Sequence, residues 1–263
     1  MASLPVSNSR DATAYGRPDQ THAAQLNASF QVLDPVARLV LLRERVEGPL
    51  VFTTSFGLED QALTHLIVRS GVDVSFVTLD TGRMFPETYG VWTATEQRYG
   101  IRIRGFCPDT VSVEALIETQ GIDGFYNSKA ARSACCGVRK VEPLGRALRG
   151  ATGWITGLRA DQSAARRTMD FVSYDPSRDL LKANPLFDWS RERIAVLAAN
   201  EHVPVSPLHA RGFLSIGCAP CTRAVAPGEP ERSGRWWWEN ETAKECGLHL
   251  TADGRLVRAE AAS

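Results

Sequence analysis

The chain lacks both a net charge and a long apolar run, and each absence excludes a class of protein. Its 30 Lys and Arg residues are balanced by 30 Asp and Glu residues. A general binder of nucleic acid or of membrane surfaces would show a basic excess, so we expect no nucleic-acid partner. No apolar run in the 263 residues approaches the roughly 18 residues of a transmembrane helix. We therefore expect no membrane-embedded segment.

A secretory signal and internal repeats are also missing. Residues 1–25 are polar, rich in Ser, Asp, Thr and Ala, and lack the apolar core of a signal peptide. We predict that they form a flexible leader and that the protein is cytoplasmic. Cytoplasmic thiols are kept reduced, so clustered cysteines among the six present are expected to bind metal or to do chemistry rather than to form disulfides.

Strand and helix patterns alternate along the rest of the chain, with glycines such as Gly71 and Gly100 marking helix ends. This alternation predicts an α/β fold with a mostly parallel sheet and helices on both faces. In such folds, ligands bind at the carboxyl ends of the strands. Strand patterns fall within residues 48–56, 72–82, 101–106, 153–160 and 180–189, and helix patterns within residues 33–47, 58–70, 86–100 and 190–201.

Three of these strand ends carry polar loops, TTSFGLEDQ, LDTGRMFPET and GLRADQSAARR. Small hydroxyls and glycine ahead of a helix suit an oxyanion held by backbone N–H groups. An ordinary capped turn or a solvated charged loop is the alternative for each loop alone. Three such loops at one sheet edge favour a nucleotide or a sulfate-like anion. The candidate binding residues are Ser55, Gly57, Leu79, Thr81, Gly157, Arg159, Arg166 and Arg167.

Four cysteines form a candidate metal set, the adjacent pair Cys135–Cys136 and the C-x₂-C pair Cys218 and Cys221. Four thiolates can close a zinc site or hold an iron–sulfur cluster. Adjacent residues can hardly chelate a single ion without strain, which favours the cluster over zinc; buried free thiols are the structural alternative. Lys140 follows four residues after Cys136, close enough to tune the charge around a cluster.

The remaining two cysteines differ from this set and from each other. Cys107, in RGFCPDT, has no such neighbours and is expected to be a small buried residue. Cys246 stands near the chain end, between Lys244 and His249. Adjacent positive charge would favour its thiolate, so it is a candidate nucleophile, with a surface cysteine of no role as the alternative.

The motifs CCGVRKVEPL, GCAPCTRAVAPGEPERSGRWWWE and KECGLH occur in this order and resemble those of the assimilatory adenylyl-sulfate (APS) reductases of bacteria and plants. The three strand-end loops resemble the nucleotide-binding loops of the same family. The resemblance spans roughly residues 30–250. It implies a Rossmann-like fold of the adenine nucleotide α-hydrolase type. The SGGxDS loop of the related ATP pyrophosphatases is replaced by SFGLED, which disfavours ATP cleavage.

The resemblance also implies a chemistry and a division of the chain. Residues 26–235 would form the nucleotide-binding domain with a [4Fe–4S] cluster on Cys135, Cys136, Cys218 and Cys221. Residues 236–263 would form a mobile C-terminal tail that carries the catalytic cysteine. Cys246 would attack the sulfur of APS, expel AMP and form S-sulfocysteine, from which thioredoxin releases sulfite. Arg232 and Arg235 would hold the phosphosulfate, and Lys140 would lie between cluster and substrate. The three tryptophans from Trp236 are expected to serve packing, with stacking on the adenine as the alternative.

Alternative functions remain open at this stage. A reductase of the 3′-phosphorylated substrate, PAPS, is the nearest, although family forms that use PAPS typically lack the four cysteines found here. A tRNA-thiolating enzyme of the same fold would need the SGGxDS loop and a basic surface, and the sequence has neither. A non-catalytic iron–sulfur sensor would leave the anion loops and Cys246 unexplained. Whether the protein is a homo-oligomer stays open.

Overall fold

The computed structural model describes residues 18–163 and 166–239, and its centre is a six-stranded sheet with the order β3-β2-β1-β4-β6-β5. Every neighbouring pair is parallel except β5 and β6, which are antiparallel. The strands are β1 (Leu50–Thr54), β2 (Ser75–Leu79), β3 (Arg104–Phe106), β4 (Gly153–Ile155), β5 (Val172–Asp175) and β6 (Leu180–Ala183). The predicted α/β fold with a mostly parallel sheet is confirmed.

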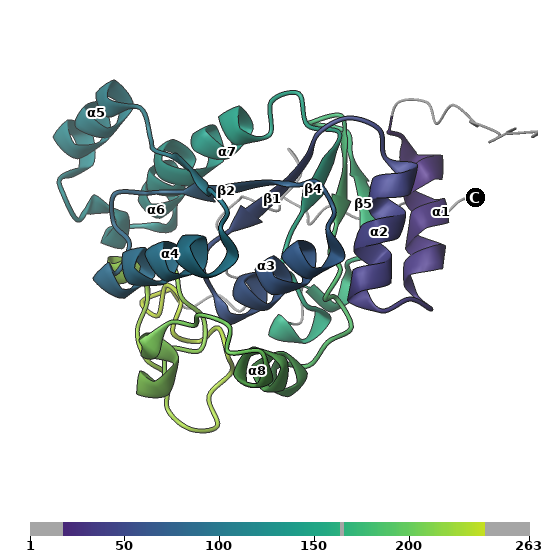
Figure 1. Ribbon diagram of the computed structural model, residues 1–263. Coiled ribbons are helices and arrows are strands. Elements are labelled where there is room, and N and C mark those ends of the chain that lie inside the picture. The colour runs from purple at the N-terminus through teal and green to yellow at the C-terminus, as the bar shows by residue number, and fades with distance from the viewer. Residues whose placement is uncertain (1–17, 164–165, 240–263) are drawn as a thin grey trace, which may run out of the picture.

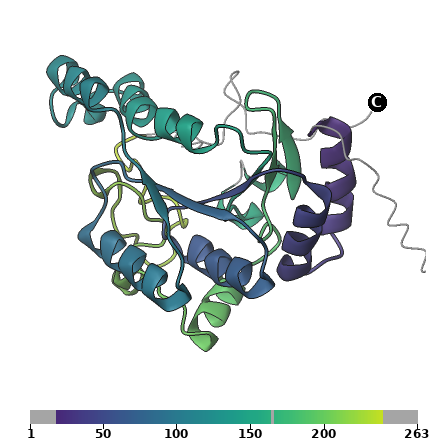
Figure 2. The same ribbon diagram turned by 45° about the horizontal axis from the view of Figure 1, so that its top comes forward.

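Helices cover both faces of the sheet (Figure 1). The turned view shows α3, α4 and α8 on one side and α6 and α7 on the other (Figure 2). On the edge beside β5, α1 packs against that strand and α2 packs against α3. The helices are α1 (Gln20–Phe30), α2 (Pro35–Arg45), α3 (Leu58–Ser70), α4 (Pro86–Tyr99), α5 (Thr110–Gln120), α6 (Lys129–Cys136), α7 (Glu142–Ala147) and α8 (Arg191–Asn200).

Two hydrophobic cores follow from the alternation of side chains along the strands. In β1, Leu50 and Phe52 enter the larger core, whereas Val51 between them enters the smaller core on the opposite face. In β4, Trp154 and Ile155 are divided in the same way. Both faces of the central strands are therefore apolar, which is why these strands read as nearly continuous hydrophobic runs in the sequence.

The predicted helix ends are confirmed where a specific residue caps them. Gly71 and Gly100 end α3 and α4 in the left-handed conformation that favours glycine (φ 68° and 63°). Ser190 accepts a hydrogen bond from the backbone N–H of Arg193 and begins α8. Residues 20–25 differ from the predicted leader because they belong to α1, where Ala23 is fully buried; residues 1–17 lie outside the described part of the chain. None of the helices described is long and apolar enough to cross a membrane.

The strand order creates a switch point between β1 and β4. The chain builds outward from β1 through β2 to β3 and then returns to the other side of β1 to form β4. The loops after β1 and β4 therefore leave the same sheet edge in divergent directions, and a crevice opens between them. This is the edge to which the three polar loops belong.

Arg38 of α2 joins α1 to the turn after β6. Its side chain is 1% exposed and donates to the backbone carbonyls of Phe30 and Pro185, each at 2.8 Å, and to both carboxylate oxygens of Asp188 at 2.6 and 2.9 Å. One guanidinium thus joins the end of α1 to the turn that follows β6.

We expect Arg38→Ala to lower the free energy of unfolding by about 2–3 kcal/mol. The variant removes the donor of the buried Pro185 carbonyl, leaves the Phe30 carbonyl with the longer bond from the Leu33 N–H at 3.4 Å, and removes the pair with Asp188. Urea denaturation measures the change. Glu44→Ala is the matched control, since Glu44 is an exposed residue of the same helix and should change stability by no more than about 0.5 kcal/mol. Equal effects of the two variants would contradict the anchoring role of Arg38.

Candidate active site

A large cavity opens at the carboxyl ends of β1, β2 and β4, and we name it the strand-end cavity. Its walls come from the loops after these strands and from the segment 214–236. Most of the binding residues expected from the sequence line it: Ser55, Gly57, Leu79, Thr81, Lys140, Gly157, Arg166, Arg232 and Arg235. The described part of the wall thus combines small hydroxyl residues with four cationic side chains.

The loop after β1 turns sharply at Phe56, a non-glycine residue in the left-handed region (φ 60°). Its ring is buried and stacks on Trp92 of α4 at 5.5 Å between centroids, and its backbone N–H donates to the Thr54 hydroxyl at 3.0 Å. Packing therefore holds a conformation that the backbone alone disfavours. The turn directs Ser55 and Gly57 into the cavity.

Asp60 is a cavity residue to which the sequence assigned no role. Its carboxylate accepts from the backbone N–H of Ser55 at 2.6 Å and from the Ser55 hydroxyl at 2.7 Å. Desolvation in the cavity wall raises the pKa of Asp60 to about 6, against the opposing effect of these two hydrogen bonds. Both polar groups of Ser55, expected to face an anion, are therefore bonded to a carboxyl. The position of Asp60 in the first turn of α3, next to the predicted anion loop, could have indicated this role from the sequence.

Gly157 allows the loops after β1 and β4 to meet. A Cβ atom at this position would lie 2.3 Å from a carboxylate oxygen of Asp60 and 3.3 Å from the Asp60 backbone nitrogen. No larger residue fits without moving α3 or the loop. Close approach of backbones, rather than a turn, is thus the reason for glycine here.

The three arginines of the loop after β4 have different environments. Arg166 is buried, lines the cavity and donates to Gln162 at 2.5 Å. Arg167 is exposed and does not line it. Arg159, also expected to bind substrate, is fully buried, is not part of the cavity lining and is ion-paired with Glu59, Asp161 and Glu231. Of the three, Arg166 is the residue placed to meet a ligand.

Arg235 supplies cationic charge from the opposite wall. Its guanidinium lies over the Trp236 ring at 4.8 Å and donates weakly to Ser215 and the Ile216 carbonyl, each at 3.4 Å. A Cβ at Gly217 would lie 2.2 Å from this guanidinium, so glycine makes room for it. The lining stretch 214–217 was not anticipated, because its residues, Leu-Ser-Ile-Gly, carry no chemical signature.

A second, smaller cavity adjoins the first, and all four cysteines of the candidate metal set line it; we name it the cysteine cavity. Cys135 and Cys136 end α6, and the backbone then widens into a π-helical turn at residues 137–141. Such turns are rare and are often found at functional sites. Cys218 precedes a single 3₁₀ turn as its N-cap, and Cys221 is the last residue of that turn. Two local irregularities thus bring two pairs of thiols to one space.

Among the described residues, the lining of the cysteine cavity is cationic and includes no carboxylate. Its charged lining residues are Arg83, Arg132, Arg139 and Lys140. Desolvation raises the pKa of Cys221 to about 12 and raises that of Cys135. The pKa of Cys218 is lowered, because Lys140, Thr81 and Arg235 outweigh its desolvation. Buried thiols among cations fit an anionic thiolate-bound group, whose metal would supply the charge that ionises the other thiols.

No group of three or more His, Cys, Asp or Glu side chains within residues 18–163 and 166–239 is arranged to hold a metal ion. All four thiols nevertheless line one cavity, so they are the described residues that could hold a thiolate-bound group.

Three residues form the wall between the two cavities. Lys140, Cys218 and Trp236 line both of them. Thr81 ties the wall to β2, because its hydroxyl contacts the Cys218 sulfur at 3.3 Å and its carbonyl accepts from Arg139 at 2.8 Å. A charge placed in one cavity therefore acts on the other across a few atoms.

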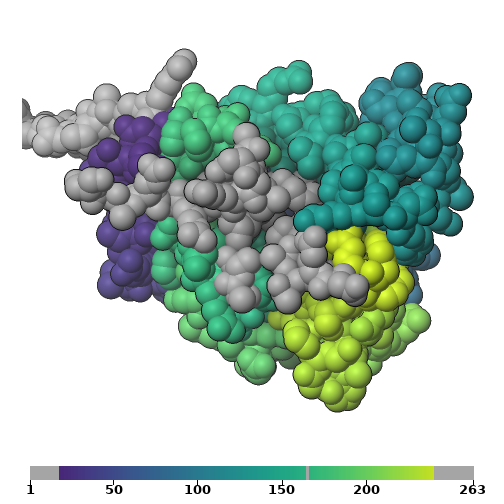
Figure 3. Space-filling view, turned by 180° about the vertical axis from the view of Figure 1, so that it is seen from behind, coloured from purple at the N-terminus to yellow at the C-terminus, as the bar shows by residue number. Residues whose placement is uncertain are grey.

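Trp236 is 1% exposed and packs with Phe125, Cys218 and Cys221, in agreement with the expected packing role. Arg132 of α6 pairs with Glu239, and the end of the described chain, yellow in Figure 3, lies against the teal segment that contains α6.

Cys107 is exposed, so its predicted burial is wrong: it follows the short edge strand β3, where no described element covers it. Cys246 and the rest of residues 240–263 lie outside the described part of the chain.

Comparison with known proteins places this site in a family. The model of the phosphoadenosine phosphosulfate reductase domain matches residues 49–224. The chain is 49% identical to an adenosine 5′-phosphosulfate reductase of Sinorhizobium fredii (strain USDA 257), over 93% of this chain and 97% of the relative. It is 51% identical to the enzyme of that name from Rhizobium meliloti (strain 1021), over 85% and 84%.

A solved structure gives the same answer for the fold. The phosphoadenylyl-sulfate reductase of Candida auris, in its phosphate complex, superposes with a TM-score of 0.65 at 25% identity, covering 79% of this chain and 98% of that one. The match of the family model spans both the strand-end loops and the cysteine pairs. The chain belongs to the phosphoadenosine phosphosulfate reductase family.

Proposed function

We propose that this protein reduces adenosine 5′-phosphosulfate to sulfite and AMP, the reaction that serves sulfate assimilation and cysteine biosynthesis. The observation that carries the proposal is the shared wall between the cysteine cavity and the cationic strand-end cavity. The relatives at 49% and 51% identity, which bear the name adenosine 5′-phosphosulfate reductase, support the unphosphorylated substrate. PAPS remains the alternative, named in the family model and in the Candida auris structure.

The strand-end cavity suits a nucleotide with a phosphosulfate group. Arg166, Arg232, Arg235 and Lys140 line it, and guanidinium groups match phosphate and sulfate oxygens in pairs. The loop residues Ser55, Gly57, Leu79, Thr81 and Gly157 complete the candidate binding set. Arg159 and Arg167 are not proposed as ligands, because the first is paired with carboxylates and the second is exposed and does not line the cavity.

In the proposed reaction, the Cys246 thiolate attacks the sulfur of APS, a bond forms between the two sulfur atoms, and AMP leaves with the electron pair of the broken S–O bond. A thiolate of a dithiol reductant of the thioredoxin class then attacks the Cys246 sulfur and releases sulfite. The second thiol of the reductant resolves the mixed disulfide. Two electrons thus pass from the dithiol to the sulfate sulfur.

We further propose that Cys135, Cys136, Cys218 and Cys221 hold a [4Fe–4S] cluster. Four thiols and four cationic side chains around a cavity without a carboxylate support this assignment. When bound, the cluster supplies a fixed charge beside the substrate site, since the dithiol already supplies the electrons. Lys140, which lines both cavities, neutralises charge on either side of the wall.

We expect the protein to release sulfite from APS with thioredoxin as reductant, and Cys246→Ser to lower the rate by about 1000-fold or more, because no other group would replace the nucleophile. AMP affinity should stay unchanged, and Cys107→Ser should keep full activity. A parallel assay with PAPS decides the substrate. Substantial turnover by Cys246→Ser would remove Cys246 as the nucleophile.

Iron-replete protein should be brown, with about four iron atoms per chain. Cys218→Ser should lose the visible absorbance and most of the iron, whereas Cys107→Ser, which changes an exposed cysteine outside the cavity, should keep both. Metal analysis and the visible spectrum measure this. A colourless wild-type protein that holds stoichiometric zinc would refute the cluster assignment.

Arg235→Ala should weaken APS binding about 10- to 100-fold, the loss expected for one charge-assisted pair to an anionic group. Calorimetric titration of APS into the protein measures the affinity. The control is Arg223→Ala, since Arg223 lies in the same segment but pairs with Glu229 and does not line the cavity. An unchanged affinity for Arg235→Ala would exclude Arg235 from the binding set.

A further inference from the structure

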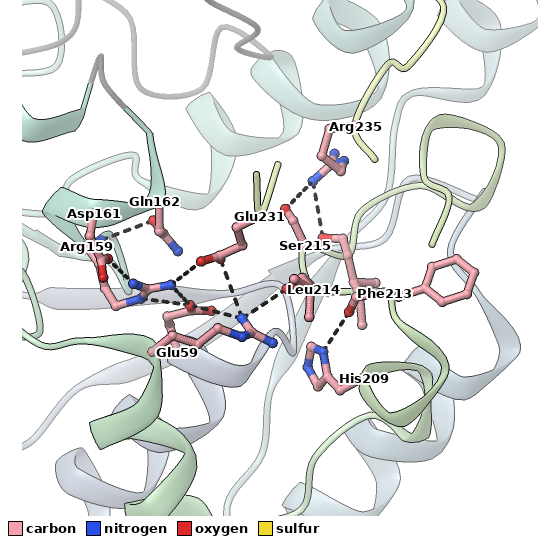
Figure 4. A network of polar contacts seen from close by, with 12 residues as sticks. Glu59, Arg159, Asp161, Gln162, His209, Phe213, Leu214, Ser215, Glu231 and Arg235 are labelled. Carbon is pink, nitrogen blue, oxygen red and sulfur yellow. Dashed lines mark hydrogen bonds and ion pairs between the residues drawn. The ribbon is translucent and has the colours of Figure 1, made fainter. Parts of the chain in front are cut away.

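Four charged residues meet in the wall of the strand-end cavity, and we name them the ion cluster: Glu59, Arg159, Arg191 and Glu231. Glu59 and Glu231 line the cavity, and Figure 4 shows both beside Arg159. Arg159 is at the centre of the ion cluster, with no exposed surface. Its guanidinium donates to Glu59 at 2.9 Å and to Glu231 at 2.6 Å. These two ion pairs outweigh the desolvation of Arg159 and raise its pKa.

Arg191 forms the second half of the ion cluster. It lies at the start of α8 and donates to the Leu214 carbonyl at 3.1 Å, with Glu231 at 3.5 Å and Glu59 at 3.8 Å. Leu214 and Glu231 both belong to the segment 212–239, which we name the C-terminal segment. Arg159, after β4, and Arg191, in α8, thus hold this segment at Glu231 and at the Leu214 carbonyl. Figure 4 shows Arg159 beside Glu231.

The C-terminal segment has little regular structure to fix its position. Its described residues form one 3₁₀ turn, Ala219–Cys221, and one isolated β-bridge between Thr222 and Arg235. No strand joins it to the sheet. Within the described residues, its place over the cavity depends on a few contacts: the backbone hydrogen bond from the Ala219 N–H to the Arg83 carbonyl at 2.8 Å, the Arg132–Glu239 pair, the packing of Trp236, and the ion cluster. Of these, the ion cluster includes Glu231, which precedes the cavity residue Arg232 in the sequence.

The anchored points lie next to the cationic residues of the cavity. Glu231 precedes Arg232, and Leu214 precedes Ser215, which accepts a hydrogen bond from Arg235. A shift of Glu231 would therefore move Arg232, its neighbour in the chain, and would reach Arg235 through the hydrogen bond from the Arg235 backbone N–H to the Arg232 carbonyl at 3.0 Å. Arg159 lies behind both, with its guanidinium already committed to carboxylates.

We propose that Glu231 and Arg159 are positioning residues, which set the place of Arg232 and Arg235 in the strand-end cavity. Arg159 does not line this cavity, and Glu231 lines it with its carboxylate held by Arg159 and Arg191. The inference rests on the proposed function only for the identity of the nucleotide. A buried ion pair suits this task because it has one favourable geometry, and removing one partner leaves an uncompensated buried charge. A neutral replacement of Glu231 would leave Arg159 with one carboxylate fewer and free the segment to move.

The first test is Glu231→Gln, which keeps the shape of the side chain and removes its charge. We expect KM for APS to rise about tenfold or more, with a smaller change in kcat, since the lost interaction acts through the binding arginines. Glu231→Asp, which keeps the charge on a shorter side chain, should recover part of the loss. Glu229→Gln is the matched control, since Glu229 lies in the same segment but pairs with Arg223 outside the ion cluster.

The second test asks whether Glu231 acts through Arg235. In an Arg235→Ala background, Glu231→Gln should cost clearly less affinity than it does in the wild type, because a residue that acts through another loses its effect when the other is absent. Fully additive losses would overturn the inference. So would wild-type KM values for Glu231→Gln.

A readout independent of turnover completes the design. Backbone hydrogen exchange in residues 228–236 should be faster in Glu231→Gln than in Glu229→Gln, at equal melting temperatures. If Glu231→Gln fails to fold, Arg191→Gln replaces it, because it breaks the outer contacts and keeps the Arg159 pair. Absence of sulfite release by the wild type would refute the proposed function alone, whereas unchanged exchange would refute the positioning role.

Discussion

A guanidinium without exposed surface sets the geometry of the carboxyl edge of the sheet. Arg159 is tolerated there because Glu59 from α3 and Glu231 from the C-terminal segment neutralise it. The three residues come from segments that are far apart in sequence, so the charge is satisfied only when all of them meet. The contact among these three residues also forms part of the wall of the strand-end cavity, which Glu59 and Glu231 line. The arrangement that neutralises Arg159 is therefore the one that forms this wall.

The second constraint is the thin wall between the two cavities. Lys140, Cys218 and Trp236 face both sides of it, and Thr81 fixes it to the end of β2. Any group held by the thiols thus lies within the electrostatic reach of a ligand at the strand ends. This proximity makes a purely structural role for the cysteines the weaker interpretation, since a structural site gains nothing from adjoining a cationic cavity.

Local patterns predicted five of the six described strands and four of the eight described α-helices, because helix caps such as Gly71 and Ser190 and the alternation of apolar residues act within a few positions. They missed β5 and the helices α1, α5, α6 and α7. The strand-end loops predicted most of the residues that line the cavity, because the carboxyl ends of parallel strands lie at one edge of the sheet. Partners were less predictable. Nothing near Arg159 in the sequence indicates Glu231 as its neighbour, and nothing near Cys107 indicates that it is left uncovered. Such facts depend on tertiary contacts.

The electrostatics of the proposed reaction explain why so many cations surround the site. An anionic thiolate must approach a phosphosulfate that already carries negative charge, and a thiolate-bound cluster nearby would add more. Opposite charges within a few ångströms and away from water offset this repulsion most strongly. Arg166, Arg232 and Arg235 line the side open to the ligand, and Lys140 lines the shared wall. Three carboxylates line the same cavity, at Glu59, Asp60 and Glu231. Glu59 and Glu231 are paired with arginines, and Asp60 accepts two hydrogen bonds from Ser55, so the four cationic side chains of the lining are left to meet an anionic ligand.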